Sequence, residues 1–219
     1  MNIAIDGPAG AGKSTIAKLL AAKLGILYLD TGAMYRAVGL KALNTDVEIS
    51  DATAVEKMLA NTEIDVRQEN GVQRVYLDGK DVSTDIRENK VSKAASDISA
   101  VPCVRYKMVE LQREIASKCD TVLDGRDIGT YVLPNAEHKI FLTASAEERA
   151  KRRYAELKAK GSDLSLEQIR DDIVKRDYND SHRALAPLKK ADDATEVDTT
   201  SMTIDEVVEK ICAVIGEKQ

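Results

Sequence analysis

Short apolar runs alternate with longer amphipathic stretches along this chain. In the amphipathic stretches apolar residues recur at helical spacing, and the helix predicted from Pro102 has an expected buried face at Val104, Met108, Leu111 and Ile115. The apolar runs have the length and composition of buried strands: "IAI" near the start, "ILYL" at 26–29, "TVL" at 121–123, "KIFL" at 139–142 and "TEV" at 195–197. Strands that alternate with helices in this way predict an α/β fold built on a parallel sheet.

One segment departs from this alternation. In "EIDVRQENGVQRVYLDGKDV" (63–82), polar and apolar residues alternate on both sides of an Asn-Gly pair. Such a pair between alternating runs favours a tight hairpin turn, because Asn and Gly both accept positive φ. We therefore expect a small antiparallel insert between the second and third strands of the main sheet.

A glycine-rich loop follows the first apolar run. The stretch "GPAGAGKS" (7–14) matches the pattern G-x-x-x-x-G-K-S between a predicted strand and a predicted helix. Glycine lets backbone N–H groups approach phosphate oxygens closely, and the helix start directs its unpaired N–H groups to the same anion. Lys13 is expected to reach the β- and γ-phosphates, Ser14 to face Mg²⁺ and Thr15 to contact phosphate. The predicted ATP-binding residues here are Gly7, Pro8, Ala9, Gly10, Ala11, Gly12, Lys13, Ser14 and Thr15.

The loop alone leaves the chemistry open. A plain glycine-rich turn between strand and helix is the simplest alternative, and ATPase motors, GTPase switches and small-molecule kinases share the motif. A GTPase would carry an N-K-x-D motif for its base, and none occurs in this sequence. The residues that follow the other strands therefore bear on the choice.

Polar clusters follow two more predicted strands. In "YLDTGAMYRAV" (28–38), Thr31 and Arg36 suit a second anion, although a capped helix with a surface arginine would give the same pattern. In "TVLDGRDIGTYVLP" (121–134), Asp124 suits the water shell of a metal, Arg126 a phosphate and Asp127 an amine donor. A structural Arg–Asp pair is the alternative there. Ligands bind past the carboxyl ends of parallel strands, which favours the functional interpretation of both clusters.

A basic, helical region lies between residues 149 and 183. It has ten basic and seven acidic residues within a chain whose formal net charge is −5. Two sets of residues share helix faces: Arg149, Arg152 and Arg153; and Arg176, Asp180 and Arg183. A solvated helix surface is the usual explanation of such a charge run. The flexible "KGSDLS" joint between two arginine-bearing helices instead favours a lid that closes over phosphates and excludes water.

Together these residues predict a kinase. Phosphoryl transfer needs an in-line γ-phosphate held by positive charge, and a loop lysine, Mg²⁺ and several arginines supply that charge. Catalytic roles are expected for Lys13, Arg126, Arg176 and Arg183.

The composition bears on the partners and the cellular compartment of the protein. The net charge of −5 argues against broad binding to nucleic acid or anionic membranes, and no apolar run approaches the ~20 residues that span a bilayer. The three cysteines, Cys103, Cys119 and Cys212, are odd in number and far apart. We therefore expect reduced thiols in a soluble, cytoplasmic and monomeric protein.

With these residues in view, the whole chain resembles the bacterial cytidylate kinases of the nucleoside monophosphate kinase family. The resemblance rests on motifs in the family's order: "IDGPAGAGKST", "LDTGAMYR", "AASDIS…VR", "DGRDIGT", "KIFLTASAEERAKRR" and "KRDYNDSHRALAPL". It implies a five-stranded parallel sheet flanked by helices, with an antiparallel insert and a helical lid. It also implies one kinase domain over 1–219, with a monophosphate-binding subdomain at 31–105 and a lid at 149–185.

The resemblance implies phosphoryl transfer from ATP to CMP or dCMP with Mg²⁺. Ser96, Arg105 and Asp127 would read the cytosine edge, whose acceptors suit a hydroxyl and a guanidinium and whose amine suits a carboxylate. Without the family, Ser96 and Arg105 look like ordinary helix-surface residues. The other implied CMP contacts are Thr31, Tyr35, Arg36, Arg126, Arg176, Asp180 and Arg183, and Arg149, Arg152 and Arg153 would belong to the lid over ATP. Ser14 and Asp124, the latter through water, would serve the metal.

Two other readings remain open at this stage. A kinase with another small acceptor, such as shikimate, gluconate or a different nucleotide, would keep the loop and the lid and change the acceptor pocket. A regulatory nucleotide switch would keep the loop and hydrolyse its nucleotide slowly, whatever acceptor is present.

Overall fold

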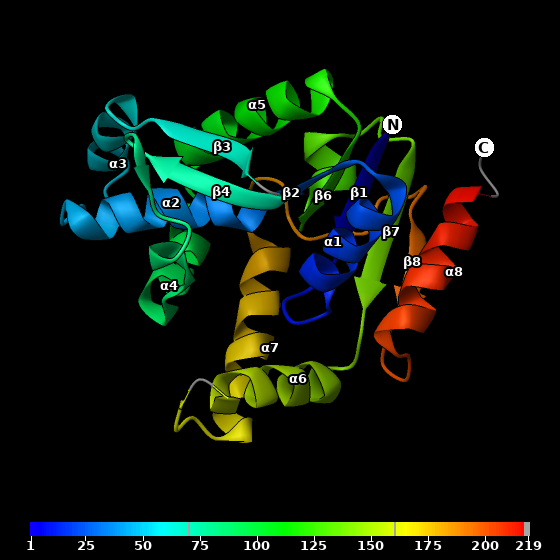
Figure 1. Ribbon diagram of the computed structural model, residues 1–219. Coiled ribbons are helices and arrows are strands. Elements are labelled where there is room, and N and C mark those ends of the chain that lie inside the picture. Colours follow the sequence, from blue (N-terminus) through cyan, green and yellow to red (C-terminus); the bar gives the residue numbers. More distant parts are fainter. Residues whose placement is uncertain (70, 160, 217–219) are drawn as a thin grey trace. The chain divides into compact units, whose positions relative to one another are not determined.

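The computed structural model describes residues 1–69, 71–159 and 161–216. Within it the chain forms two compact units, Met1–Tyr28 with Cys119–Gln219, and Leu29–Lys118. Figure 1 shows the helices and strands of both units along the chain.

A five-stranded sheet carries the first unit. Its strands are β1 (Asn2–Asp6), β2 (Leu27–Asp30), β6 (Thr121–Gly125), β7 (His138–Thr143) and β8 (Thr195–Asp198), in the order β2-β6-β1-β7-β8. The last two residues of β2 belong to the second unit. β1 runs parallel to both β6 and β7, and β7 runs parallel to β8. All five predicted strands and the parallel α/β fold are thereby confirmed. Because β1 and β6 are neighbours, the loops that follow them start side by side.

Helices cover this sheet and extend beyond it. The first unit contains α1 (Lys13–Leu24), a π-helical turn (Ile128–Val132), α6 (Ala146–Ala159), α7 (Leu166–His182) and α8 (Ile204–Gly216). Buried aliphatic side chains of the central strands pack with those of α1 and α8, among them Ile5, Leu20, Ile140 and Ile211. Helices α6 and α7 pack on each other through a separate small core of Ala150, Leu157, Ile169 and Ile173. The two arginine-bearing helices therefore form a compact hairpin of their own (Figure 1).

The second unit combines helices with a small sheet. It contains α2 (Thr31–Asn44), α3 (Ala52–Ala60), β3 (Ile64–Glu69), β4 (Val72–Leu77), β5 (Lys80–Asp81), a 3₁₀ turn (Asp85–Arg87), α4 (Asn89–Ile98) and α5 (Pro102–Lys118). β3 and β4 pair antiparallel from Ile64 opposite Leu77 to Glu69 opposite Val72. The predicted antiparallel insert is confirmed, and β5 adds a third strand to it. Asn70, and with it the predicted Asn-Gly turn, lies outside the described residues.

The buried face of α5 differs from the expected one. Its buried residues are Val104, Arg105, Met108, Val109, Gln112 and Ala116, whereas Leu111 and Ile115 are only half-buried. The face is rotated because two polar side chains, Arg105 and Gln112, occupy interior positions. Apolar periodicity therefore predicted the helix and misplaced the centre of its buried face.

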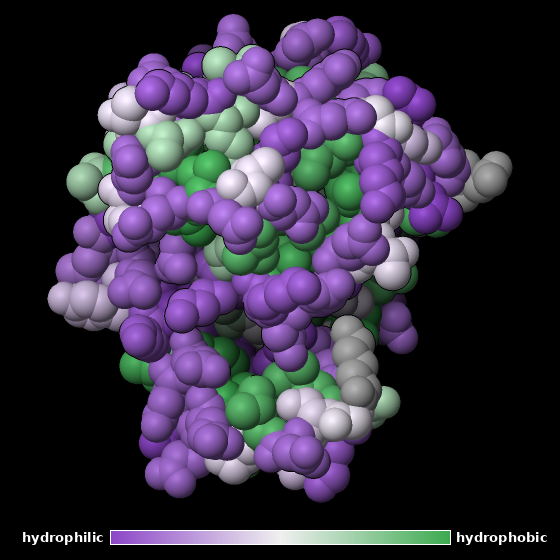
Figure 2. Space-filling model, turned by 90° about the vertical axis from the view of Figure 1, so that its left-hand side faces the viewer, coloured by the Kyte–Doolittle hydropathy of each residue, from purple (hydrophilic) through white to green (hydrophobic). Residues whose placement is uncertain are grey.

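Hydrophilic side chains dominate the face shown in Figure 2, where hydrophobic residues form small areas between them. In the part of the chain that the structure describes, no helix combines the length and apolarity that crossing a bilayer requires. No disulfide joins Cys103, Cys119 or Cys212 within the described residues.

Candidate active site

The glycine-rich loop connects β1 to α1 in a conformation that needs its glycines. Gly7 has φ +147°, and a Cβ there would overlap the carbonyl oxygen of Leu142 on β7. Gly12 is the N-cap of α1 and has no side chain with which to cap the first N–H groups. The start of α1 is therefore available to an anionic ligand, which the dipole of the helix also favours.

Lys13 is a buried ammonium among like charges. Its side chain is 5% exposed, and Nζ donates a hydrogen bond to the carbonyl oxygen of Pro8 at 2.7 Å. Burial and then the charge of Arg126 hold the pKa of Lys13 well below its ordinary value, with a further contribution from Arg176. An anion bound beside these three cations would relieve their repulsion.

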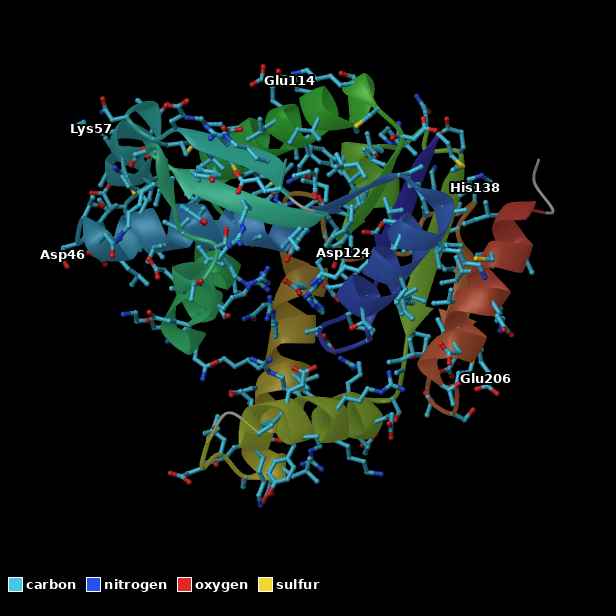
Figure 3. All side chains as sticks on the ribbon, in the orientation of Figure 1. Asp46, Lys57, Glu114, Asp124, His138 and Glu206 are labelled. Atoms are coloured by element: carbon cyan, nitrogen blue, oxygen red, sulfur yellow. The ribbon has the colours of Figure 1, made fainter. Side chains whose placement is uncertain are left out.

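A hydroxyl and a carboxylate lie together where β6 meets α1. Ser14 Oγ donates to Asp124 Oδ2 at 2.6 Å, and the hydroxyl of Tyr28 donates to Asp124 Oδ1 at 2.9 Å. Figure 3 shows Asp124 beside the first turns of α1. Hydroxyl and carboxylate oxygens are the hard donors that Mg²⁺ accepts, and Mg²⁺ keeps several waters and phosphate oxygens besides one or two such ligands. A site with one hydroxyl and one carboxylate therefore fits an Mg²⁺ ion that takes its remaining ligands from phosphate and water.

Two ion pairs join the loop after β6 to α7 and the segment after it. Arg126 Nε donates to Asp180 Oδ2, and Arg183 Nη2 donates to Asp127 Oδ1, each at 2.8 Å. Burial acts to raise the pKa of Asp180, but the charges of Arg126 and Arg176, with that of Arg183, hold it below its ordinary value. The structure thus brings together five of the residues that the sequence singled out in this unit: Arg126, Asp127, Arg176, Asp180 and Arg183.

Asp6, which the sequence analysis did not single out, supports the loop that carries Arg126 and Asp127. It ends β1 and is 4% exposed. Its two carboxylate oxygens accept the backbone N–H groups of Ile128 at 2.8 Å and Gly129 at 2.7 Å. A Cβ at Gly129 would lie in ordinary contact with Asp6 Oδ2, at 3.4 Å, and would approach Cδ of the Lys139 side chain more tightly, at 3.1 Å. The strand that leads into the glycine-rich loop is thereby bonded directly to the neighbouring loop.

The three predicted lid arginines have different surroundings. Arg149 is buried and bonds to Asp177 of α7, and Arg152 Nη2 donates to the carbonyl oxygen of Thr199 at 2.7 Å. Arg153 is more exposed and pairs with Glu156 on its own helix. Their spacing places the three arginines on one helix face, but each of them contacts a different part of the unit. Lys160, in the predicted joint between α6 and α7, lies outside the described residues.

In the second unit, Asp30 organises the start of α2. It caps the helix by accepting the N–H of Ala33 at 2.9 Å, and it pairs with Arg36 at 3.7 Å and Arg87 at 3.2 Å. The adjacent Thr31 is 3% exposed. The predicted cluster of Thr31 and Arg36 therefore combines a helix cap with a hydroxyl and two guanidinium groups.

Arg105 is a core residue, whereas the sequence taken without the family resemblance suggests a place on a helix surface. It is 1% exposed, donates from Nε to the carbonyl oxygen of Ser99 at 3.0 Å, and lies over the ring of Tyr35 at 5.3 Å from the centroid. Ser96, which lies on α4, is half-buried. Burying a guanidinium costs free energy of desolvation unless its N–H groups are paired. Arginine is rarely buried, and no local pattern in the sequence signals such burial.

Comparison with known proteins shows the family of this chain. The family profile for cytidylate kinase matches residues 3–217. The chain belongs to the cytidylate kinase family. A cytidylate kinase of Lactobacillus johnsonii is 55% identical over 219 residues, which are 100% of this chain and 95% of that protein. One of Caldicellulosiruptor saccharolyticus is 54% identical over 211 residues, covering 96% of this chain and 93% of that protein.

Solved structures agree on the fold alone. An uncharacterized protein from Eubacterium ventriosum superimposes with a TM-score of 0.53 at 14% identity, covering 99% of this chain and 98% of that one. Family membership confirms the resemblance that the sequence motifs indicated. In this member of the cytidylate kinase family, the glycine-rich motif follows β1, "DGRDIGT" begins with the last two residues of β6, and "KRDYNDSHR" spans the end of α7.

Proposed function

We propose that this protein transfers the γ-phosphoryl group of ATP to CMP or dCMP, giving ADP and CDP or dCDP. The observation that carries the proposal is the buried Lys13 beside Arg126 and Arg176, next to the uncapped start of α1. Three cations in one place suit the phosphates of a donor and an acceptor. Membership of the cytidylate kinase family supplies the reaction class, that of a nucleoside monophosphate kinase.

The donor is ATP, bound by the backbone of the loop from Gly7 to Gly12. Lys13 binds the β- and γ-phosphates, and Thr15 adds a hydroxyl. Ser14 and Asp124 would hold Mg²⁺, directly and through water respectively, and the bound ion would offset charge on the phosphates. Arg152 and Arg153 are proposed to act from the lid, and Arg149 to contribute to the ATP site. Transfer then depends on alignment and on positive charge more than on covalent chemistry by the protein.

The acceptor is a cytidine monophosphate. Its phosphate is bound by Thr31, Arg36, Arg126 and Arg183, and its sugar by Arg176 and Asp180. Ser96, Arg105 and Asp127 bind the cytosine edge, with Tyr35 packing near the base. The cation–ring contact between Arg105 and Tyr35 supports this assignment, because it places together two residues that are both proposed to contact the base.

Three further assignments belong to the same proposal. Residues 31–105 form the monophosphate-binding part of a single kinase domain, and residues 149–185 form its lid. The protein acts as a cytoplasmic monomer that binds neither nucleic acid nor membranes. Sedimentation at several concentrations tests the monomer, which requires a mass that does not change with concentration.

The test of the activity is ADP formation from Mg·ATP with a panel of acceptors: CMP, dCMP, UMP, AMP, GMP, dTMP, shikimate and gluconate. The proposal requires CMP and dCMP to stand well above the others. A different best acceptor would leave the donor site standing and refute the base assignment of Ser96, Arg105 and Asp127. Slow ADP formation that no acceptor accelerates would refute the kinase activity and favour a nucleotide switch.

A further inference from the structure

An ion pair between α6 and α7 holds one residue of the glycine-rich loop. Arg149 Nη1 lies 2.6 Å from Asp177 Oδ2. Arg149 Nη1 also donates to the carbonyl oxygen of Ala9 at 2.9 Å, and the N–H of Ala9 donates to Asp177 Oδ1 at 3.3 Å. The two members of one ion pair thus bond to both backbone polar groups of a single loop residue.

The surroundings of this pair fix its position. Arg149 Nε donates to the carbonyl oxygen of Ala144, just after β7, at 2.9 Å. Gly10 has φ +77°, and a Cβ there would approach Arg149 Cβ to 3.3 Å. The loop therefore packs closely against the first turn of α6. Arg149 is 6% exposed and Ala9 is 8% exposed, so these hydrogen bonds are largely shielded from water.

These contacts are hard to reconcile with a phosphate ligand. The guanidinium of Arg149 already donates to two carbonyl oxygens and a carboxylate. Turning toward a phosphate would leave the buried carbonyl of Ala9 without this donor and Asp177 without its cation. A buried polar group that loses its partner costs about 1–3 kcal/mol, and a charged one costs more. Arg149 is better placed to act on the nucleotide through the loop.

We propose that Arg149 and Asp177 are positioning residues, which hold the glycine-rich loop in its phosphate-binding conformation through Ala9. The inference rests on the proposed function only in taking ATP as the donor. If Arg149 and Asp177 act in this way, the affinity for the donor phosphates depends on how α6 and α7 pack with each other. Neither residue needs to touch the nucleotide for this dependence.

The test measures the dissociation constants of Mg·ADP and Mg·ATP for the full-length protein by titration calorimetry. Asp177→Asn keeps the size of the side chain and removes its charge. Asp171→Asn is the matched control, because Asp171 lies on the same helix in an exposed pair with Arg170. We expect Asp177→Asn to weaken both nucleotides about tenfold, the scale of one lost hydrogen bond to a charged group. The control should stay within about twofold of the wild type on the same scale.

Whether Asp177→Asn raises or lowers the nucleotide affinity distinguishes a positioning role of Arg149 from direct phosphate binding. If Arg149 bound phosphate directly, Asp177→Asn would release its guanidinium, and nucleotide affinity would rise or stay unchanged. Either result would overturn the proposal. Arg149→Lys should also weaken both nucleotides, and the double variant should be no weaker than the worse single one, since the pair acts as a unit.

Amide exchange in the wild type gives a second answer should Asp177→Asn fail to fold. The N–H of Ala9 should stay protected when Mg·ADP is added, because the ion pair is retained. Loss of that protection on binding would contradict the proposal. All of these measurements use the donor nucleotide alone. A protein that proved to phosphorylate a different acceptor would therefore fail the acceptor panel and still give a clear answer here.

Discussion

Replacement of Asp6 by Asn tests the electrostatics at the base of the glycine-rich loop. Two effects oppose each other at this carboxylate. Burial raises its pKa, and the N–H donors of Gly129 and Ile128 lower it. Burial wins, and the pKa of Asp6 is raised from 3.8 to about 6.

The contribution of Asp6 to the free energy of unfolding follows from the difference between these two pKa values. Each pKa unit corresponds to about 1.36 kcal/mol, so the rise from 3.8 to about 6 amounts to about 3 kcal/mol for this buried group. Because the folded state binds the proton at higher pH than the unfolded state does, the contribution of Asp6 stabilises the fold as the pH falls from about 6 towards 4. Above pH 6 this stabilisation is absent.

The assay is urea unfolding followed by far-ultraviolet circular dichroism between pH 4 and pH 7.5, for the wild type and Asp6→Asn. The free energy of unfolding is plotted against pH for each protein. The difference between the two plots excludes the titration of every other group that the substitution leaves unchanged. The free energy of unfolding of the wild type, relative to the variant, should rise by about 3 kcal/mol as the pH falls through this window. The carboxyl carbon of Asp6 should titrate in NMR spectra with a midpoint near 6. A flat difference curve, or one that rises with pH, would refute the reasoning, as would a midpoint below 4.

Three other outcomes are expected. Gly7→Ala forces a Cβ onto the carbonyl oxygen of Leu142, so it should cost at least about 2 kcal/mol of stability and abolish measurable ADP binding; a variant with wild-type melting temperature and affinity would contradict the loop geometry. Arg183→Lys removes the guanidinium that bonds Asp127 through Nη2 and the carbonyl oxygen of Ala186 through Nε. The KM for CMP should therefore rise about tenfold or more while that for ATP changes little; an equal rise in both would argue against an acceptor role. Bound phosphates should restore the proton affinity of Lys13, so ADP binding near pH 9, below the ordinary lysine value of about 10.4, should take up protons. Calorimetry in two buffers of different ionisation enthalpy measures this uptake, and an equal heat in both would count against it.

The sequence predicted the parts of the fold that have local signals. The five parallel strands and the β3–β4 hairpin were found from short-range patterns, because buried strands and turn residues leave period and composition in the chain. The glycine loop has an equally local signature, since its glycines are required by the backbone itself. The buried face of α5 was misplaced, because Arg105 and Gln112 are polar residues in the interior. Periodicity counts apolar residues and has no means to find a buried guanidinium.

The supporting residues of the site had no such signal. Asp6 bonds to backbone 122 and 123 residues away, and Asp177 bonds to Ala9 across 168 positions. An aspartate at a strand end or within a charged helix is typical of solvated or capping positions, so neither stands out before the chain is folded. The ligand-facing residues could be proposed because family motifs carry them, whereas the residues that hold them in place emerged from tertiary contacts.

Phosphoryl transfer from ATP to CMP is tested most directly by following the γ-phosphoryl group itself. ATP labelled at the γ-phosphate is incubated with the protein, Mg²⁺ and CMP, and the products are separated. Transfer to CMP requires that the label appears in CDP, in an amount equal to the ADP formed, and that little appears as inorganic phosphate. Label released as inorganic phosphate at a rate that CMP does not change would contradict it.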